Sequence, residues 1–456
     1  MDRLSGDPGV LVDRRTTLAS GTAPVLSQGM GSQDKPPSPD PSDLFPVPGL
    51  TLARPTPARS GTAPITPVIT PRPPGEATPM DADQPGYDQT GPWVVTGLRE
   101  YDGVMEWELS RHIVRFHGGG SRKCEISLPE RDLSATHFML ERRDRSLRLY
   151  DLHSARGTWV MDSRITTADL RAGSTFTAKP VTFVAMNDAM RKHRPDLVEI
   201  VGAYWGHSPD RIMVEAAGSG HLVITGEPGC EHERLAVAIH EMSPRQAREL
   251  ITIEPPGSDR AKLVEQVKRA SQDAASIGTT VVLKLAAGAT RLDETFLSML
   301  FSPTYGIRVI VVGHHIDDAR HALGESIVAL FQHVLLRPLV YRKEEVDQLL
   351  DRRFRVRGAP QLRAAELFDH NRMALQRYSW PENLAELRLV ADILVAYETQ
   401  GGWRGAESDL GKPRSTMLDH TERVGLQTRR IEGARRGSTR HSFFQPSART
   451  APDGDA

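Results

Sequence analysis

Cysteine, long apolar runs and net charge are all scarce in this chain of 456 residues. Two cysteines, Cys124 and Cys230, cannot form a disulfide framework, which excludes a small disulfide-stapled secreted fold and favours a reducing interior. The longest apolar stretches, such as residues 280–283, are too short to span a bilayer, and the N-terminus has no apolar signal core. The formal net charge is −1, so any charged partner surface has to be local. We expect a soluble cytoplasmic protein with no membrane partner.

Aromatic residues are almost missing from residues 1–92, which hold 18 of the 33 prolines. Such a segment cannot bury enough apolar surface to offset the entropy of ordering it, so we expect a disordered Pro/Thr-rich tail. Residues 427–456 are basic and rich in Gly and Ser, and we predict a second disordered tail there. The length of the chain between these tails predicts a multidomain protein.

Residues 93–190 consist of short alternating apolar segments separated by Gly, Asp and Ser turns, which is typical of a β-sandwich. Four motifs stand in order within it: "CEISL" at 124–128, "SATH" at 134–137, "DLHSARGTWV" at 151–160 and "LRAG" at 170–173. Together they resemble the forkhead-associated (FHA) domain. The resemblance implies that loops at one end of the sandwich bind a phosphothreonine-containing protein.

A phosphate group carries close to two charges and needs hydroxyls, amides and a guanidinium around it. The resemblance places Ser134 at the position of the family's phosphate-contacting serine and gives His137 a bracing role inside that loop. The Gly-Arg pair of the family falls on Gly119 and Gly120, so only Arg122 remains to supply the guanidinium, and Arg156 replaces the expected Asn. The predicted phosphopeptide site is therefore Ser134, Arg122, Arg156 and Thr158. The alternative is a sandwich kept for protein contacts alone.

Residues 195–342 alternate between near-continuous apolar strands and amphipathic helices, which predicts an α/β domain with a parallel sheet covered on both faces. The expected strands are 222–225, 250–253, 280–285, 307–312 and 334–336. The expected helices carry apolar faces with Leu235, Ile239 and Met242; with Leu263, Val267, Ala270 and Ala274; and with Leu292, Phe296 and Leu300. Residues 343–399 are helical throughout and form a lid.

The order of motifs in this region resembles the AAA+ module of bacterial enhancer-binding proteins, the ATPases that activate sigma-54 RNA polymerase. The motifs are "VITGEPG" at 223–229, "LAVAIHEMSPR" at 235–245, "TTVVLKL" at 279–285, "IRVIVVGHH" at 307–315 and "YSWPENLAELR" at 378–388. The sequence after Ile253 leads into one helix and contains nothing like the family's sigma-contacting motif.

The residues that an ATPase needs are missing from this module. A phosphate-binding loop uses a Lys to reach the β- and γ-phosphates and a hydroxyl to hold Mg²⁺. His232 and Glu233 stand at those positions, and Glu231 adds a negative charge. The other substituted positions are Lys284-Leu285 for the metal-holding Asp-Glu pair, His314 for the sensor Asn and Ala385 for the lid arginine. We expect a vestigial site at Gly226, Glu227, Gly229 and His232, without hydrolysis, metal or cofactor; weak nucleotide binding through glycine amides stays open.

Residues 400–426 resemble the helix-turn-helix that closes this family, as in the Fis nucleoid protein. Ala406 lets two helices cross closely, and Gly411 permits the tight turn. Residues 401–450 hold ten Lys/Arg and five Asp/Glu, which is the electrostatic pattern of nucleic-acid binding. The predicted DNA contacts are Lys412, Arg414, Ser415, Thr416, His420 and Arg423. The alternative is a helical hairpin that only ends the fold, favoured by Asp419 and Glu422 on the reading helix.

These observations predict a non-enzymatic bacterial transcriptional regulator. An FHA-like domain senses phosphothreonine, a C-terminal helix-turn-helix binds DNA, and the AAA+ module serves as an inactive scaffold. Because Fis-type units read paired half-sites, we expect a homo-oligomer, or a hetero-assembly with intact AAA+ relatives. One alternative is a phospho-dependent adaptor without DNA binding. The other is an ATP-binding activator of sigma-54 polymerase.

Overall fold

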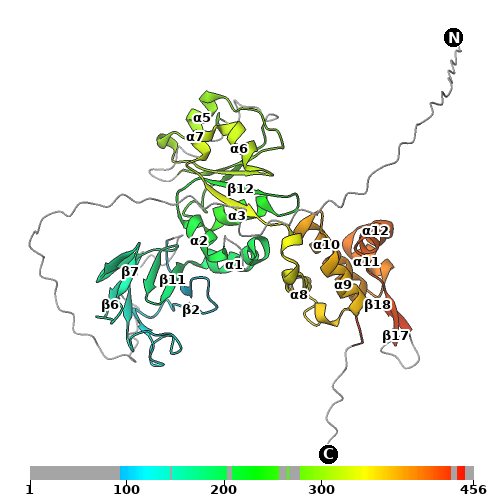
Figure 1. The fold of residues 1–456 in the computed structure, drawn as a ribbon, viewed down its shortest axis with the longest axis horizontal. Helices are drawn as coiled ribbons and strands as arrows, with labels where there is room; N and C mark the ends of the chain where they lie inside the picture. Colours follow the sequence, from blue (N-terminus) through cyan, green and yellow to red (C-terminus); the bar gives the residue numbers. More distant parts are fainter. Residues whose placement is uncertain are drawn as a thin grey trace, which may run out of the picture. The chain divides into compact units, whose positions relative to one another are not determined.

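The computed structural model describes residues 93–143, 146–202, 208–255, 264–265, 278–432 and 439–446 (Figure 1). The predicted tail at 1–92 lies outside these residues. So do 447–456 and most of the segment after β13, including the helix expected around Leu263, Val267, Ala270 and Ala274.

The first described region is a sandwich of two sheets, one of six strands in the order β2-β1-β11-β10-β7-β8 and one of five in the order β4-β3-β5-β6-β9. Phe138 of one sheet packs against Phe176 and Phe183 of the other, with ring centroids 5.1 and 5.4 Å apart, so alternating apolar residues meet in one core. The strands are β1 Gly97–Glu100, β2 Glu106–Glu108, β3 Arg115–Gly119, β4 Ile126–Ser127, β5 Phe138–Arg143, β6 Ser146–Asp151, β7 Thr158–Val160, β8 Ser163–Ile165, β9 Thr167–Leu170, β10 Thr175–Ala178 and β11 Val181–Met186.

Two helices, α1 (Asp188–Val201) and α2 (Pro209–Ala217), follow the sandwich directly. Each begins at a side-chain cap: Asn187 accepts from the Met190 amide, and Ser208 accepts from the Arg211 amide. Their apolar faces pack into the core of the next domain, so the α/β region begins near residue 188 and not at 195.

The α/β domain is a five-stranded sheet in the order β13-β14-β15-β12-β16 with every pair parallel. Leu222 and Ile224 face a core shared with α1, α2 and α3, whereas Val223 between them faces a core shared with α5 and α6. Figure 1 displays α3 and α6 on opposite faces of the sheet. The elements are β12 Leu222–Gly226, α3 His232–Met242, β13 Leu250–Ile253, β14 Thr280–Lys284, α5 Glu294–Leu300, η1 Pro303–Tyr305, β15 Arg308–Gly313, α6 Ile316–Leu323, α7 Glu325–Val328 and β16 Gln332–Leu336.

The helical region is built around α10, which buries Leu387, Val390 and Leu394 in one core with Trp380 and Phe354. A second, smaller cluster joins Ile393 and Ala396 of α10 to the two helices that follow. The elements are η2 Leu339–Tyr341, η3 Lys343–Glu345, α8 Val346–Val356, η4 Ala364–Glu366, α9 Asp369–Arg377, α10 Asn383–Thr399, α11 Trp403–Leu410, α12 Arg414–Val424, β17 Arg429–Glu432 and β18 Thr439–Ser442.

The segment after Leu426 differs from the predicted disordered tail. β17 and β18 form an antiparallel pair, and the chain then buries Phe443 and Phe444 in the helical core. Asn371 fixes the base of this hairpin: its Nδ2 donates to the carbonyls of Gln427 and Phe443, and its Oδ1 accepts from the Gln427 amide. Residues 427–432 and 439–446 are therefore part of the fold. Within the described residues, no helix combines the length and apolarity needed to cross a membrane.

Candidate functional sites

Three loops of the sandwich meet at Ser134. The β3–β4 loop reaches it through the Gly120 amide, which donates to the Ser134 carbonyl at 2.9 Å. The β6–β7 loop reaches it through the Ala155 amide, which donates to Ser134 Oγ at 3.1 Å. The hydroxyl is half-buried and still has its own proton to donate outward. Ser134 therefore sits where a ligand at this end of the sandwich can contact all three loops.

The two arginines predicted to bind phosphate at this end of the sandwich differ in whether an acidic side chain already pairs with them. Arg122 is exposed, and no ion pair to it is recorded among the described residues. Arg156 forms an ion pair with Asp132, and both side chains are more than half exposed. A phosphate that approaches Arg156 has to displace the Asp132 carboxylate, whereas Arg122 is available without rearrangement. Of the two arginines, Arg122 is the one without an ion pair among the described residues.

Thr158 is not a ligand contact. Its side chain is fully buried, and its hydroxyl donates to Asp151 Oδ1 at 2.8 Å, next to a second bond from Ser154. The prediction for Thr158 was wrong. A hydroxyl residue beside a loop glycine suggests an exposed side chain, and the hydrogen bond with Asp151, which buries it, cannot be recognised from the sequence. Thr158 fixes the β6–β7 connection from inside.

His137 has the bracing role expected of it. The ring is fully buried, and Nε2 lies 3.3 Å from the Gly157 carbonyl. Burial lowers the pKa of His137, so the ring is neutral near pH 7. A neutral donor directly before β5 thereby holds the β6–β7 loop.

The second site lies at the carboxyl end of β12, which sits between β15 and β16. This is the point where the strand order reverses, and ligands of open α/β sheets bind there. Gly229, with φ of +78°, lies against the Glu382 backbone so closely that a Cβ would meet the Glu382 carbonyl oxygen at 2.0 Å. The Asn383 side chain donates to the Pro228 carbonyl at 2.9 Å. The loop is covered by the start of α10.

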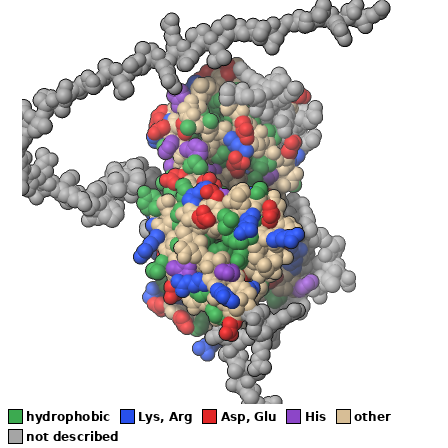
Figure 2. Space-filling view, turned by 90° about the vertical axis from the view of Figure 1, so that its right-hand side faces the viewer, with side chains coloured by type: hydrophobic (Ala, Val, Ile, Leu, Met, Phe, Trp, Pro, Cys, Tyr) green, Lys and Arg blue, Asp and Glu red, His purple; other side chains and the backbone are tan. Residues whose placement is uncertain are grey.

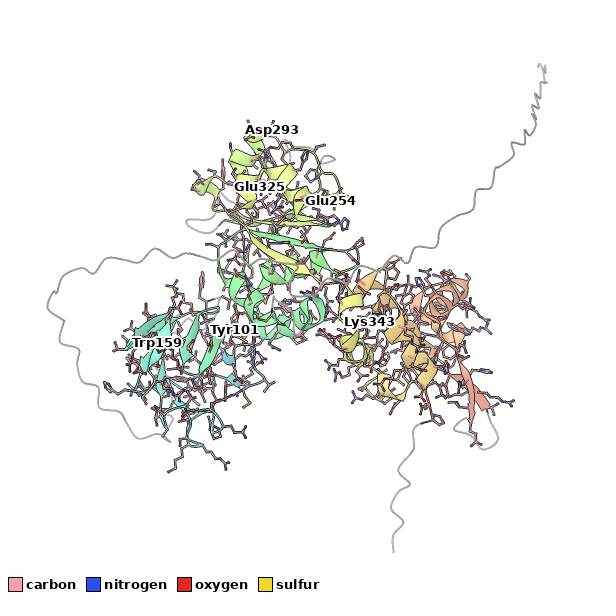
Figure 3. All side chains as sticks on the ribbon, viewed as in Figure 1. Tyr101, Trp159, Glu254, Asp293, Glu325 and Lys343 are labelled. Carbon is pink, nitrogen blue, oxygen red and sulfur yellow. The ribbon has the colours of Figure 1, made fainter. Side chains whose placement is uncertain are left out.

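A lysine bridges the two acids where an ATPase would hold its metal. Lys284 Nζ lies 2.7 Å from Glu233 Oε2 and 3.0 Å from Glu254 Oε1, and these two carboxylates raise its pKa. Glu254 follows β13 and is labelled in Figure 3. In an ATPase, carboxylates from the strand and a hydroxyl from the helix surround a cation. Here the charges are exchanged, because the strand supplies the cation and the helix supplies the carboxylate.

Arg388 of α10 forms a second set of ion pairs over the loop. It contacts Glu231 Oε1 at 2.7 Å and Glu199 Oε1 at 2.6 Å, and all three side chains are at least four-fifths buried. Glu199 Oε2 also forms an ion pair with Arg352 Nε of α8, at 3.2 Å. The Glu231 carboxylate is therefore paired with a guanidinium of the protein itself, and this pair ties α10 to the loop.

His232, at the position where the sequence analysis expected a phosphate-binding lysine, is the first residue of α3. Burial lowers the pKa of His232, so the ring is uncharged near pH 7. His314 at the sensor position stands edge-on to it, with ring centroids 6.2 Å apart. No group of three or more His, Cys, Asp or Glu side chains in the described part of the chain is placed to hold a metal ion.

The third site is formed by α10, α11 and α12. Ala406 and Met417 are fully buried against Ile393 and Ala396, so α10 supplies the first helix of this unit. Gly411 has φ of +61° and makes the turn. Lys412, Arg414, Ser415 and Thr416 are exposed at the start of α12.

The remaining predicted contacts of α12 are less available. His420 is half-buried, and Arg423 is paired with Asp419 along the same helix. Thr421, at an expected apolar position, is buried with its hydroxyl bonded to the Met417 carbonyl at 3.1 Å. The exposed cations and hydroxyls of α12 are thus concentrated at its N-terminal end.

The comparisons with known proteins identify one of these regions. Residues 117–178 match the family model of the FHA domain. This part of the sandwich is an FHA domain. No curated protein sequence matches the chain. Among solved structures, the FHA domain is similar to one from a structural and functional analysis of phosphothreonine-dependent FHA domain interactions, at 20% identity, covering 20% of this chain and 94% of that chain, with a TM-score of 0.19.

Two further solved structures extend the comparison. EmbR from Mycobacterium tuberculosis, in complex with a low affinity phosphopeptide, is 19% identical over 20% of this chain and 24% of that chain, with a TM-score of 0.19. NtrX from Brucella abortus, in complex with ATP, is 16% identical over 52% of this chain and 72% of that chain, with a TM-score of 0.32. Likenesses at these TM-scores do not by themselves assign an activity.

Proposed function

We propose that this chain is a non-enzymatic bacterial transcriptional regulator. Its FHA domain binds a phosphothreonine-containing protein at Ser134 and Arg122, and the unit of α10, α11 and α12 binds DNA. The α/β domain is an inactive relative of the sigma-54 activator module that connects the two binding functions. The observation that carries the proposal is the pair of internal salt-bridge clusters, around Lys284 and around Arg388, at the point where an ATPase binds its nucleotide.

The charges around the loop after β12 support the proposal that this domain does not hydrolyse ATP. An ATP-bound site needs a cation at the loop and a carboxylate on the strand, both directed at Mg²⁺ and phosphate. This chain has Glu231 on the loop and Lys284 on the strand, and each already has an internal partner of opposite charge. A nucleotide would have to break these pairs, at a cost of roughly 1.5–3 kcal/mol for a largely buried contact of Arg388 and about 0.5–1 kcal/mol for the exposed pairs of Lys284. A repelling carboxylate adds to that cost.

An ATP experiment tests this part directly. We expect the purified full chain with ATP and Mg²⁺ to release phosphate at the background rate, and calorimetric titration with ATP to give no heat of binding at micromolar concentrations. Phosphate release clearly above background that disappears in His232→Ala or Glu231→Ala, but not in the surface control Arg355→Ala, overturns the inactive-scaffold assignment. The alternative of an ATP-binding activator then becomes the better reading.

A phosphopeptide experiment tests the FHA function. The full chain is incubated with an immobilised phosphothreonine peptide library and with the same library unphosphorylated. We expect phospho-dependent capture that falls at least tenfold in Ser134→Ala and Arg122→Ala, because each removes a contact to a doubly charged ligand. Ser163→Ala, an exposed hydroxyl on β8, is the matched control and retains capture. Equal capture of both libraries contradicts phosphothreonine recognition.

A DNA titration separates the regulator from the adaptor. Binding of a fluorescein-labelled duplex should weaken steeply as salt rises, because each phosphate that a cation neutralises releases a counterion. Arg414→Ala should weaken binding, since Arg414 is exposed at the start of α12. Failure of the chain to bind duplex DNA at 50 mM salt favours the phospho-dependent adaptor, a reading that Asp419 and Glu422 on the exposed side of α12 already support.

A further inference from the structure

The hairpin of β17 and β18 gathers exposed cations that the sequence analysis assigned to a structureless tail. Arg429, Arg430 and Arg440 are exposed, as is His441, and they occupy three consecutive rungs of the ladder: Arg429 opposite Ser442, Arg430 opposite His441, and Ile431 opposite Arg440. The one acid of the two strands, Glu432, lies on the next rung toward the tip. The three rungs nearest the base therefore carry a basic patch that is divided between the two faces of the hairpin, with Arg429 and Arg440 on one face and Arg430 and His441 on the other.

The patch is held in a fixed place by its base. Glu398 of α10 accepts from Ser442 Oγ and from the Phe443 amide, both at 2.8 Å, and the Asn371 side chain contacts both ends of the hairpin. The Phe443 ring packs against Tyr397 and Trp403, with centroids 5.0 and 6.0 Å away. These contacts connect the hairpin to α10 and α11, so its arginines are presented by a rigid support.

The hairpin also lies close to α12 in the chain and in space. Only residues 425–428 separate the end of α12 from the start of β17. Burial raises the pKa of Tyr397, and the positive charges of both Arg414 and Arg440 act on the same hydroxyl in the opposite direction. Figure 2 is turned toward the right-hand side of Figure 1, where α12 and the hairpin are drawn, and Lys and Arg side chains are spread over this face.

Charge balance indicates why α12 needs such a neighbour. α12 contains two arginines and two acids, so the helix itself has no net charge, and Arg423 is paired with Asp419. The hairpin strands contain three arginines and one acid. Affinity for a duplex comes mainly from cations that neutralise phosphates, while groove contacts supply specificity. In this unit the hairpin supplies cations that neutralise phosphates, and the start of α12 supplies the groove contacts.

We propose that the β17–β18 hairpin is a second DNA-contacting element, in which the guanidinium groups of Arg429, Arg430 and Arg440 bind phosphate groups of the duplex that α12 reads. This proposal rests on the proposed DNA-binding function. Arg430 points away from the supporting helices, because its ladder neighbours Arg429 and Arg440 contact Phe368 and Glu398 on the inner face. The guanidinium groups of Arg429 and Arg440 bind phosphates from the edge of the hairpin.

The test measures the salt dependence of DNA binding by the full-length protein. The probe is a fluorescein-labelled duplex of mixed sequence, about 30 base pairs long, titrated at several NaCl concentrations. Each lost phosphate contact should reduce the slope of log K against log salt by about 0.9. We expect Arg430→Ala to weaken binding roughly eightfold at 0.1 M salt, which is the counterion term for one contact. The triple Ala variant of Arg429, Arg430 and Arg440 should lower the slope by about 2 to 3.

Control variants keep the outcome interpretable. Arg363→Ala removes an exposed lid arginine outside the patch and should leave affinity and slope unchanged. Arg430→Lys retains the charge and should restore most of the slope. Arg414→Ala reports the contribution of α12. Thermal melts followed by tryptophan fluorescence, to which Trp403 beside Phe443 contributes, establish that the hairpin variants stay folded.

The outcomes separate the two proposals. If the wild type binds the duplex and Arg414→Ala weakens it while the triple variant keeps the full slope, the hairpin proposal fails and the DNA-binding function stands. If the wild type does not bind the duplex, both fail. A triple variant that loses binding to polyglutamate while its binding to DNA is unchanged assigns the patch to an acidic protein and overturns the hairpin proposal.

Discussion

The residue Lys284 illustrates how one exchange of charge changes a site. Its ammonium stands between Glu233 and Glu254, whose side chains are 62% and 67% exposed. Replacement by Met leaves two carboxylates facing each other without a cation. Because these acids are well solvated, we expect Lys284→Met to lower the free energy of unfolding by only about 0.5–1 kcal/mol. Urea denaturation measures this value.

The origin of that loss is tested by a double-mutant cycle. Lys284→Met combined with Glu233→Gln should cost less than the sum of the two single changes, and the coupling should shrink in 1 M NaCl because salt screens exposed charges. A coupling that persists at high salt would attribute the effect to packing of the lysine stem and not to the ion pair.

Individual residues also mark the limit of sequence-based prediction. Ser134 and His137 could be assigned from their places in a motif, and the structure puts both where three loops meet. Thr158 was predicted wrongly, because its burial depends on Asp151, a partner from another strand. The ion pairs of Lys284 and Arg388 could not be predicted either: their partners lie up to 189 residues away in sequence. The sequence shows which residues depart from the motif. It does not show the ion pairs that these residues form in the folded chain.

At the scale of the element, α10 is the helix on which the α/β domain, the lid and α11 all depend. Its Arg388 forms ion pairs with Glu199 and Glu231, and all three side chains are largely buried. We expect Arg388→Ala to destabilise the protein by about 2–3 kcal/mol, since the largely buried Glu231 loses its partner and Glu199 keeps only its pairs with Arg352 and Arg234. Urea denaturation gives the magnitude, and hydrogen exchange at residues 227–231 should rise. The exposed lid change Arg355→Ala is the control; an equal effect there would contradict the argument.

The hairpin element depends on Asn371 in the same way. This fully buried amide makes three hydrogen bonds to the chain at the two ends of the hairpin. Asn371→Ala should cost about 2 kcal/mol and expose residues 427–432 and 439–446 to limited proteolysis, because backbone groups of Gln427 and Phe443 lose their partner. Arg363→Ala is expected to retain the wild-type cleavage pattern. Unchanged cleavage in Asn371→Ala would mean that Phe443 and Phe444 alone hold the hairpin.

The elements differ in how well their sequence predicts them. Each strand of the parallel sheet was expected within about two residues, because buried parallel strands are near-continuous apolar runs that need no partner to be recognised. The hairpin was missed because "RRIE" and "TRHS" contain hardly any apolar side chains and flank a glycine-containing basic segment. Its stability comes from tertiary contacts of Asn371, Glu398 and Phe443, which no local pattern announces.

For the whole molecule, the histidines of the α/β domain predict how stability responds to acid. Burial lowers the pKa of His221, His232, His240 and His333, so each is neutral in the folded domain. As pH falls, the unfolded chain takes up these protons first, at the ordinary pKa near 6.5. Their stabilising contribution is complete above that pH and is lost as pH falls through the lowered values.

This predicts that the melting temperature falls progressively between about pH 7 and pH 5, with each kcal/mol lost lowering it by about 2–4 °C. His240, bonded to Thr280 and to the Arg248 carbonyl, is the best probe. His240→Gln keeps polar atoms there but does not titrate, so the variant should melt lower at pH 7.5 and lose less on acidification. The exposed control His441→Gln should follow the wild-type profile. An identical acid slope in His240→Gln would show that other groups, such as paired carboxylates, govern the response.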